Sequence, residues 1–222
     1  MNNKMESLKS TNSQYNFNLN KYLLAAGFIG PIIFFLTIYL LFPLMYSGYN
    51  PVNQYISELG APGSPVKTLT NVLGFSLLGV LTMIFSIGVF RSKELNKLGK
   101  FSALFISITG LLMYLVGIFY CDVGCNNYSM IGEIHEMVST SGQVQVLAVG
   151  YILFAFSVYN HKKLKFLTPL ILFLGVITLI LAYYTAFYQG YIPYPGILQR
   201  SAIGLPYIIM AIIAFSMYRL EG

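Results

Sequence analysis

The sequence predicts an all-α protein, a polytopic transmembrane bundle of six spans with both termini cytoplasmic. The first observation is composition, because 56% of the 222 residues are hydrophobic and only 9% are charged. A typical soluble domain is about 25% charged. The second observation is a set of six apolar stretches, each near the roughly 20 residues that a helix needs to cross a bilayer. They cover residues 22–45, 69–90, 101–120, 138–159, 166–187 and 203–218.

The distribution of basic residues predicts the orientation. With the N-terminus inside, eleven of the 13 lysines and arginines fall in inner segments, and only Lys67 and Arg200 fall outside. This is the positive-inside pattern of a multi-pass protein, which we expect in the cell membrane. Since the basic residues stand in short turns, where they meet lipid headgroups, the charge of +6 does not indicate nucleic-acid binding. We expect membrane lipid as a partner and no nucleic acid.

Domain organisation is simple, because six spans use most of the chain. Residues 1–20 are polar and rich in Asn and Ser, so we expect a disordered cytoplasmic tail. Residues 21–222 then form a single six-helix transmembrane domain. No short apolar segment precedes the first span, so no signal peptide is expected.

The first outer loop, residues 46–67, contains a candidate short helix at the level of the lipid headgroups. It reads VNQYISELG, where Asn53 or Gln54 would begin the helix and Gly60 would end it. Its apolar residues are spaced along one face, which should meet the bundle or lipid. Ser57 and Glu58 lie beside that face.

The remaining loops differ between the two sides of the membrane: the inner loops carry basic residues and the outer loops carry reactive side chains. The inner loops 91–100 and 160–165 are basic, whereas the outer loop 121–136 holds the densest cluster of reactive side chains. The fourth span opens with polar residues at helical spacing, which are costly against lipid, so this span should line a polar cleft open to the outside. The last outer loop is aromatic and ends at Arg200. No internal repeat is visible, so the inverted-repeat signature of secondary transporters is missing.

Two cysteines, Cys121 and Cys125, stand four residues apart in the second outer loop. On an oxidising side of the membrane, this spacing predicts a disulfide. Together with Asp122 and His135 the cysteines also offer enough donors for zinc. Because the disulfide would use both thiols, we predict no metal. The two histidines, His135 and His161, fall on opposite sides of the membrane, which argues against haem. No cofactor is predicted.

The candidate site collects Glu58, Asp122, His135 and Arg200 at the outer mouth. A carboxylate from Asp122 or Glu58 beside His135 is suited to acid–base catalysis, with Ser57 as a nucleophile if a base reaches it. Arg200 is suited to binding an anion such as a carboxylate or phosphate. We expect His135 to approach Asp122 or Glu58. We also expect Arg200 to form an ion pair with one outer acid, either Glu58, Asp122 or Glu133. The simpler alternative is that Arg200 only ties loops together and His135 only reaches water.

Four motifs carry a family resemblance: ISELG after the first span, CDVGC after the third, GEIHE at the fourth and GILQR before the last. Together they resemble the prokaryotic membrane family called domain of unknown function 998. The resemblance implies six helices and an outer polar site, and it brings no activity. Gln199 stands where a Glu is common in that family. The matching positions are Ser57, Glu58, Leu59, Gly60, Cys121, Asp122, Gly124, Cys125, Gly132, His135, Gly196 and Arg200.

Three functions remain open from the sequence. The leading hypothesis is an accessory or binding protein whose outer cleft takes a lipid headgroup, a partner subunit or a second copy of the chain. The alternative is a membrane-embedded hydrolase or transferase acting on lipid at the outer leaflet. Seven-span lipid hydrolases are only faintly similar, because their zinc needs three histidines and this chain has two. A small-solute transporter is the third reading.

Overall fold

The computed structural model describes residues 19–139, 143–187 and 193–221, and within these ranges every regular element is helical. Six helices are long and apolar enough to span a membrane, which confirms the predicted fold class. The expected tail, residues 1–20, lies outside the described residues except for Leu19 and Asn20, which begin the first helix. The six spans are Leu19–Leu44, Lys67–Arg91, Lys97–Ile118, Met130–Val158, Leu167–Thr185 and Pro195–Leu220.

The spans are built from shorter elements along the chain. The first ends in a π-helix and a final helical turn, and the second begins with a single α-turn and a second π-helix. Two 3-10 helices stand in the loops. The elements are η1 (Phe35–Leu41), α2 (Phe42–Leu44), η2 (Ile56–Gly60), α3 (Lys67–Leu69), η3 (Thr70–Ser76), α4 (Leu77–Arg91), α5 (Lys97–Ile118), η4 (Val123–Cys125), α6 (Met130–Ser139), α7 (Gln143–Val158), α8 (Leu167–Phe187) and α9 (Pro195–Leu220).

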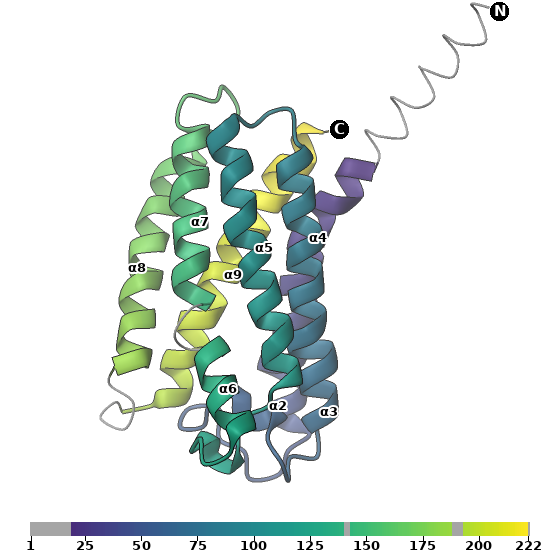
Figure 1. Ribbon diagram of the computed structural model, residues 1–222, viewed down its shortest axis with the longest axis vertical. Coiled ribbons are helices and arrows are strands. Elements are labelled where there is room, and N and C mark those ends of the chain that lie inside the picture. The colour runs from purple at the N-terminus through teal and green to yellow at the C-terminus, as the bar shows by residue number, and fades with distance from the viewer. Residues whose placement is uncertain (1–18, 140–142, 188–192, 222) are drawn as a thin grey trace, which may run out of the picture.

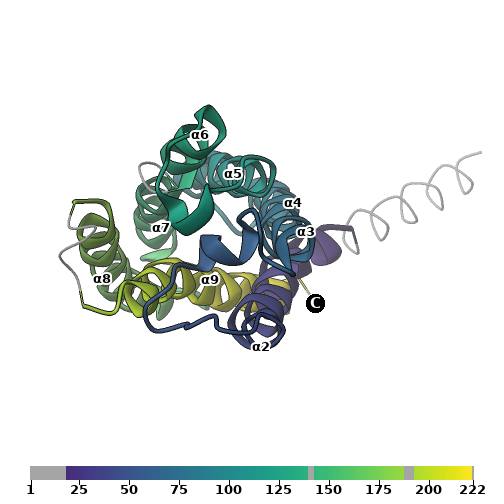
Figure 2. The same ribbon diagram turned by 90° about the horizontal axis from the view of Figure 1, so that it is seen from below.

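The spans pack as a ring in chain order (Figures 1 and 2). Helices α4 and α5, α5 and α7, α7 and α8, and α8 and α9 are direct neighbours. The first span closes the ring against α9, where the Phe28 ring meets the rings of Phe215 and Tyr218 edge-on at 5.9 and 5.6 Å. The Asn20 side chain donates to Glu221 near the chain's other end. Both described ends of the chain therefore lie at one end of the bundle, here called the terminal end.

The outer surface of the ring is apolar, as a lipid-facing surface must be. Four large apolar side chains on it are each at least half exposed: Leu36, Leu40, Phe173 and Phe215. Other phenylalanines of the chain are buried. The core inside the ring includes Phe34, Phe75, Phe85 and Phe154. Large apolar side chains on both surfaces explain why the spans read as continuous hydrophobic stretches rather than as amphipathic helices.

Candidate functional site

The short helix of the first outer loop, η2, closes the end of the bundle opposite the termini. In Figure 2 it lies inside the ring of spans, and we call it the plug and this end the plugged end. Ile56 and Leu59 are fully buried and Ser57 is 5% exposed. The predicted end at Gly60 is confirmed, but the helix begins at Ile56 rather than at Asn53 or Gln54. Its apolar face meets the bundle.

Glu58 holds the plug by local hydrogen bonds. Its Oε1 accepts from the Tyr55 backbone N–H at 2.8 Å, and its Oε2 accepts from the Gln54 side chain at 2.9 Å. These contacts satisfy donors at the start of η2, as a capping residue does. Within the part of the chain that the structure describes, Glu58 makes no ion pair.

Arg200 clamps the loop that leads into the plug. Its Nη1 donates to the carbonyl oxygens of Pro51 at 2.7 Å, Gln54 at 2.9 Å and Gly196 at 3.1 Å, and its Nη2 donates to the Tyr49 hydroxyl. Among the described residues no carboxylate pairs with it. The predicted ion pair of Arg200 with Glu58, Asp122 or Glu133 is therefore wrong. The reason is that α9 begins at Pro195, before the expected start at residue 203, so Arg200 lies inside a helix against loop carbonyls.

The neighbours of Arg200 on α9 dock the same loop. The Gln199 Oε1 accepts from the Ile56 N–H at 2.6 Å, and the Ile197 N–H donates to the Val52 carbonyl at 3.2 Å. A Cβ added at Gly196 would overlap the carbonyl oxygens of Pro51 and Gln54. Only glycine permits this close approach, so Gly196, Gln199 and Arg200 form one docking surface on α9. Sequence reasoning missed the role of Gln199, and read it only as a lost acid.

Side chains of both π-helices, η1 and η3, donate hydrogen bonds at the plugged end. The Tyr39 hydroxyl in η1 donates to the Arg200 carbonyl at 2.6 Å. The Asn71 amide in η3 donates to the Gly60 carbonyl at 2.9 Å and is itself buried. The wider turns of π-helices often occur at functional sites. Here they present side chains that fasten the plug and its docking helix.

Asp122 organises the loop before α6. Its Oδ2 accepts from the Ser129 N–H at 2.8 Å, and its Oδ1 accepts from the Ser129 hydroxyl at 2.7 Å. Burial acts to raise the pKa of the Asp122 carboxyl, but these hydrogen bonds outweigh it and hold the pKa below its ordinary value. A Cβ added at Gly132 would overlap this carboxylate, which explains the glycine at the first turn of α6.

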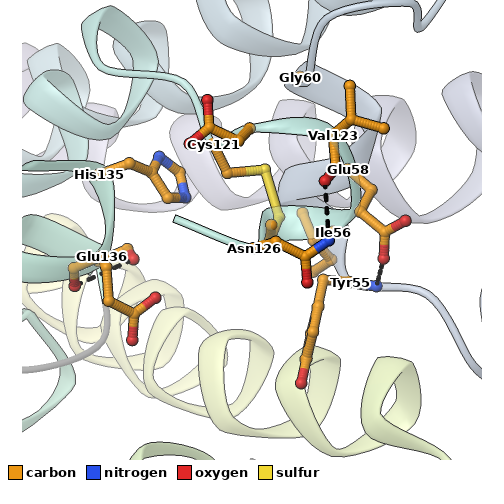
Figure 3. The surroundings of a disulfide bond; sticks show 12 residues. Tyr55, Ile56, Glu58, Gly60, Cys121, Val123, Asn126, His135 and Glu136 are labelled. Carbon is orange, nitrogen blue, oxygen red and sulfur yellow. Dashed lines mark hydrogen bonds between the residues drawn. A yellow bond between two sulfur atoms is a disulfide. The ribbon is translucent and has the colours of Figure 1, made fainter. Parts of the chain in front are cut away.

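His135 lies buried on α6, with 3% of its surface exposed. Its Nδ1 lies 2.6 Å from the carbonyl oxygen of Phe119, just after the last turn of α5. Within the described residues the ring forms no hydrogen bond with Asp122 or Glu58. Figure 3 shows the ring pointing toward the disulfide, with Glu58 on the far side of it. His135 therefore joins α6 to the end of α5. Asp122 lies near enough to act on the ring electrostatically, without a hydrogen bond between them.

Cys121 precedes the short helix η4 and Cys125 ends it. Their Cα atoms are 5.0 Å apart, and their sulfur atoms lie within bonding distance. Figure 3 draws the bond. The arrangement supports the predicted disulfide. The tight loop needs left-handed backbone at Gly124 and Cys125, with φ of 67° and 53°.

Few contacts at the plugged end support the hypothesis that the protein is an enzyme. Ser57 forms no hydrogen bond with a histidine or a carboxylate among the described residues. These residues also contain no group of three His, Cys, Asp or Glu side chains able to hold a metal ion. Thus the structure gathers the predicted residues at one end of the bundle, but assigns Glu58, Asp122, His135 and Arg200 separate backbone partners.

Comparison with known proteins identifies a family. The family model described as "Protein of unknown function (DUF998)" matches residues 28–216. The match runs from the first span to the last and covers well over half of the chain. No curated protein and no solved structure matches the chain. The resemblance carried by the four loop motifs is confirmed.

Proposed function

We propose that this chain, which belongs to the DUF998 family, binds an anionic lipid at the plugged end of the bundle, with Arg200 as the partner of the headgroup. The role is a binding role without catalysis. The proposal builds on the multi-pass helical fold, and it rests on one observation. Arg200 is a half-buried cation whose hydrogen-bond partners are all neutral.

The charge of Arg200 calls for an anion. Its acceptors among the described residues are three backbone carbonyls and the Tyr49 hydroxyl. Burial raises the pKa of the Tyr49 phenol, and Arg200 opposes this rise without reversing it, so Tyr49 stays uncharged. The Nε of Arg200 is buried without a partner. A guanidinium within a membrane span normally pairs with an opposite charge, because low-dielectric surroundings penalise an uncompensated ion.

The surroundings of Arg200 fit a lipid. A groove of about 400 Å³ runs from Arg200 along α9, between η1 and α8. Its walls are mostly apolar and include Phe35, Leu181, Leu205 and Ile208. A phosphate at Arg200 would leave an acyl chain free to follow this groove. Bidentate contact between guanidinium and phosphate oxygens is the favoured geometry for such a headgroup.

The enzyme and transporter readings have less support. A hydrolase or transferase needs a base bonded to its nucleophile, and Ser57 forms no hydrogen bond with a histidine or carboxylate among the described residues. Both readings stay predictions from the sequence. A partner subunit or second copy likewise stays a prediction, since nothing in a single chain bears on it.

Native mass spectrometry of the full chain, released from detergent with added lipid, tests the proposal. We expect retention of phosphatidylglycerol over phosphatidylcholine, and Arg200→Gln should weaken that retention about ten-fold, the loss of a charged hydrogen bond. Arg219→Gln, a change to an exposed arginine at the terminal end of the same helix, should have no effect.

Because Arg200→Gln also removes the loop clamp, a second pair of variants keeps the test informative. Ile208→Trp fills the groove and leaves Arg200 in place, so it should reduce retention of the same lipid. Ile108→Trp places the same residue on the exposed face of α5, away from the groove, and should not. Equal retention of both lipids by the wild type, or unchanged retention in Ile208→Trp, would overturn the proposal.

A further inference from the structure

We infer that a small cavity beneath the plug is a second binding site, for an uncharged ligand that carries hydroxyl groups. The inference goes beyond the proposed lipid function and does not depend on it. The cavity measures about 40 Å³ and lies between the plug and helices α5 to α9. A buried water needs about 10–15 Å³ by this kind of measure, so the cavity holds about three water-sized groups.

Polar side chains without partners converge on this cavity. Ser57, 5% exposed, contributes a hydroxyl that forms no hydrogen bond with any described residue. Gln143, 3% exposed, donates through Nε2 to the Tyr207 hydroxyl at 3.1 Å, and its amide oxygen has no described partner. Gln199 uses Oε1 for the Ile56 N–H, which leaves its Nε2 open. Each of these side chains lines the cavity.

Such an arrangement is costly unless something fills it. Buried polar groups in proteins are nearly always hydrogen-bonded, and the cost of leaving them unpaired rises at membrane depth. Two of the three side chains are more than nine-tenths buried and line the cavity, so partners for their free polar atoms must come from within it. Together they offer a hydroxyl, an amide donor and an amide acceptor to one small space. The bound group must therefore both donate and accept hydrogen bonds.

The residues that line the cavity also determine which charge a ligand can carry. The described side chains around the cavity are all uncharged. An anion would find no cation there, and a metal ion would find no carboxylate, so neither would be compensated. A hydroxyl group fits, since it donates one hydrogen bond and accepts others. The source is either a free polyol or the hydroxyl of a neutral lipid such as a diacylglycerol.

The cavity is separate from the Arg200 groove, although both use α9. Gln199, Ala202 and Ile203 face the cavity, whereas Arg200 and Ile208 face the groove. Loss of one site therefore need not remove the other. Ser57 is the most useful residue for a test, because its hydroxyl supports no other described contact and its removal should leave the fold intact.

The test follows the thermal unfolding midpoint of the full chain in detergent during titration with glycerol or with 1,2-dioctanoylglycerol. We expect one of the two probes to raise the midpoint saturably, and Ser57→Val, which also fills space, should weaken that apparent affinity about five-fold or more. Ser201→Ala, on the groove side of α9, should match the wild type. A saturable response to glycerol identifies a free polyol, and one to dioctanoylglycerol identifies a lipid hydroxyl.

Two results would overturn the inference: no saturable response of the wild type to either probe, or equal affinity in Ser57→Val. Dioctanoylglycerol with its hydroxyl acetylated serves as the matched probe and should not bind. Ile208→Trp separates the two proposals, because it fills the groove without touching the plug loop. It should lower retention of phosphatidylglycerol while leaving the response to the hydroxyl probe unchanged.

Discussion

The candidate site residues at the plugged end hold backbone groups and neighbouring polar side chains rather than one another. Arg200 binds loop carbonyls, His135 lies against the Phe119 carbonyl, and Asp122 accepts from Ser129. The sequence places reactive residue types in the outer loops, and that placement was predicted. Their partners could not be predicted, because backbone carbonyls are present at every residue and leave no signature in the sequence. A pairing of charges was the expectation, and it is wrong for Arg200.

Asp122 should make stability depend on acid pH. Its folded pKa lies below the ordinary value of an aspartate, about 3.9 in an unfolded chain. Its contribution is therefore complete above the unfolded pKa and is lost as the pH falls through the lower folded value. Asp122→Asn should lower the thermal midpoint at neutral pH, and its deficit should shrink as the pH falls below the unfolded pKa. A deficit that is independent of pH would assign the effect to shape rather than charge.

Gly196 should be sensitive to a single methyl group. Gly196→Ala forces the loop carbonyls of Pro51 and Gln54 away from α9 and should cost about 1–3 kcal/mol, as overpacking does. Gly175→Ala, on α8 with open space around it, is the matched control and should be neutral or stabilising by about 0.5–1 kcal/mol. The measurement is the unfolding free energy of both variants in detergent. Similar values for the two would contradict the docking of the loop on α9.

At the scale of elements, hydropathy predicts the spans well and the plug poorly. The first, second, third and fifth spans lie near their expected ranges, because the length of a span follows from the thickness of the bilayer. The fourth begins at Met130, well before the expected residue 138. The sixth begins earlier, at Pro195, since polar residues such as Gln199 and Arg200 do not end a helix that is covered by protein. The position of η2 inside the ring depends on contacts with Gln199 of α9 and Asn71 of η3. The four loop motifs were the only signal for them.

Asn71 should control how firmly the plug is seated. Its amide donates to the Gly60 carbonyl in a buried position. Asn71→Ala removes this bond and should destabilise the protein by about 1–3 kcal/mol. Asn126→Ala removes a similar side chain–backbone bond on the exposed surface and should cost less than about 0.5 kcal/mol. In a Ser57→Cys background, a thiol reagent should react faster when Asn71 is also replaced. Unchanged reactivity would show that Asn71 does not hold the plug.

At the scale of the whole molecule, the chain forms a ring of six spans with its described ends together and a plug at the other end. An even number of spans predicts this arrangement of the ends. The orientation in the membrane rests on the split of basic residues, eleven to two, which remains a prediction. Buried hydroxyls inside the spans, such as those of Thr82 and Thr109, donate to carbonyls of their own helices, which satisfies them without water.

The orientation can be measured with single cysteines. A cysteine at Ser64, in the loop after the plug, should react with an impermeant thiol reagent added to intact cells. A cysteine at Lys93, in the loop between α4 and α5, should react only after the membrane is opened. The physical basis is the retention of lysine and arginine on the cytoplasmic side. The opposite pattern at both positions would reverse the orientation, and would place the Arg200 groove in the inner leaflet.

The most direct test of the account is an experimental map of the protein in a bilayer that contains phosphatidylglycerol. We expect headgroup density within hydrogen-bond distance of the Arg200 guanidinium, with an acyl chain along the groove beside α9. The same map in Arg200→Gln should lack that density while the spans stay in place. A groove that is empty in the wild type, or a protein carboxylate seated against Arg200, would contradict it.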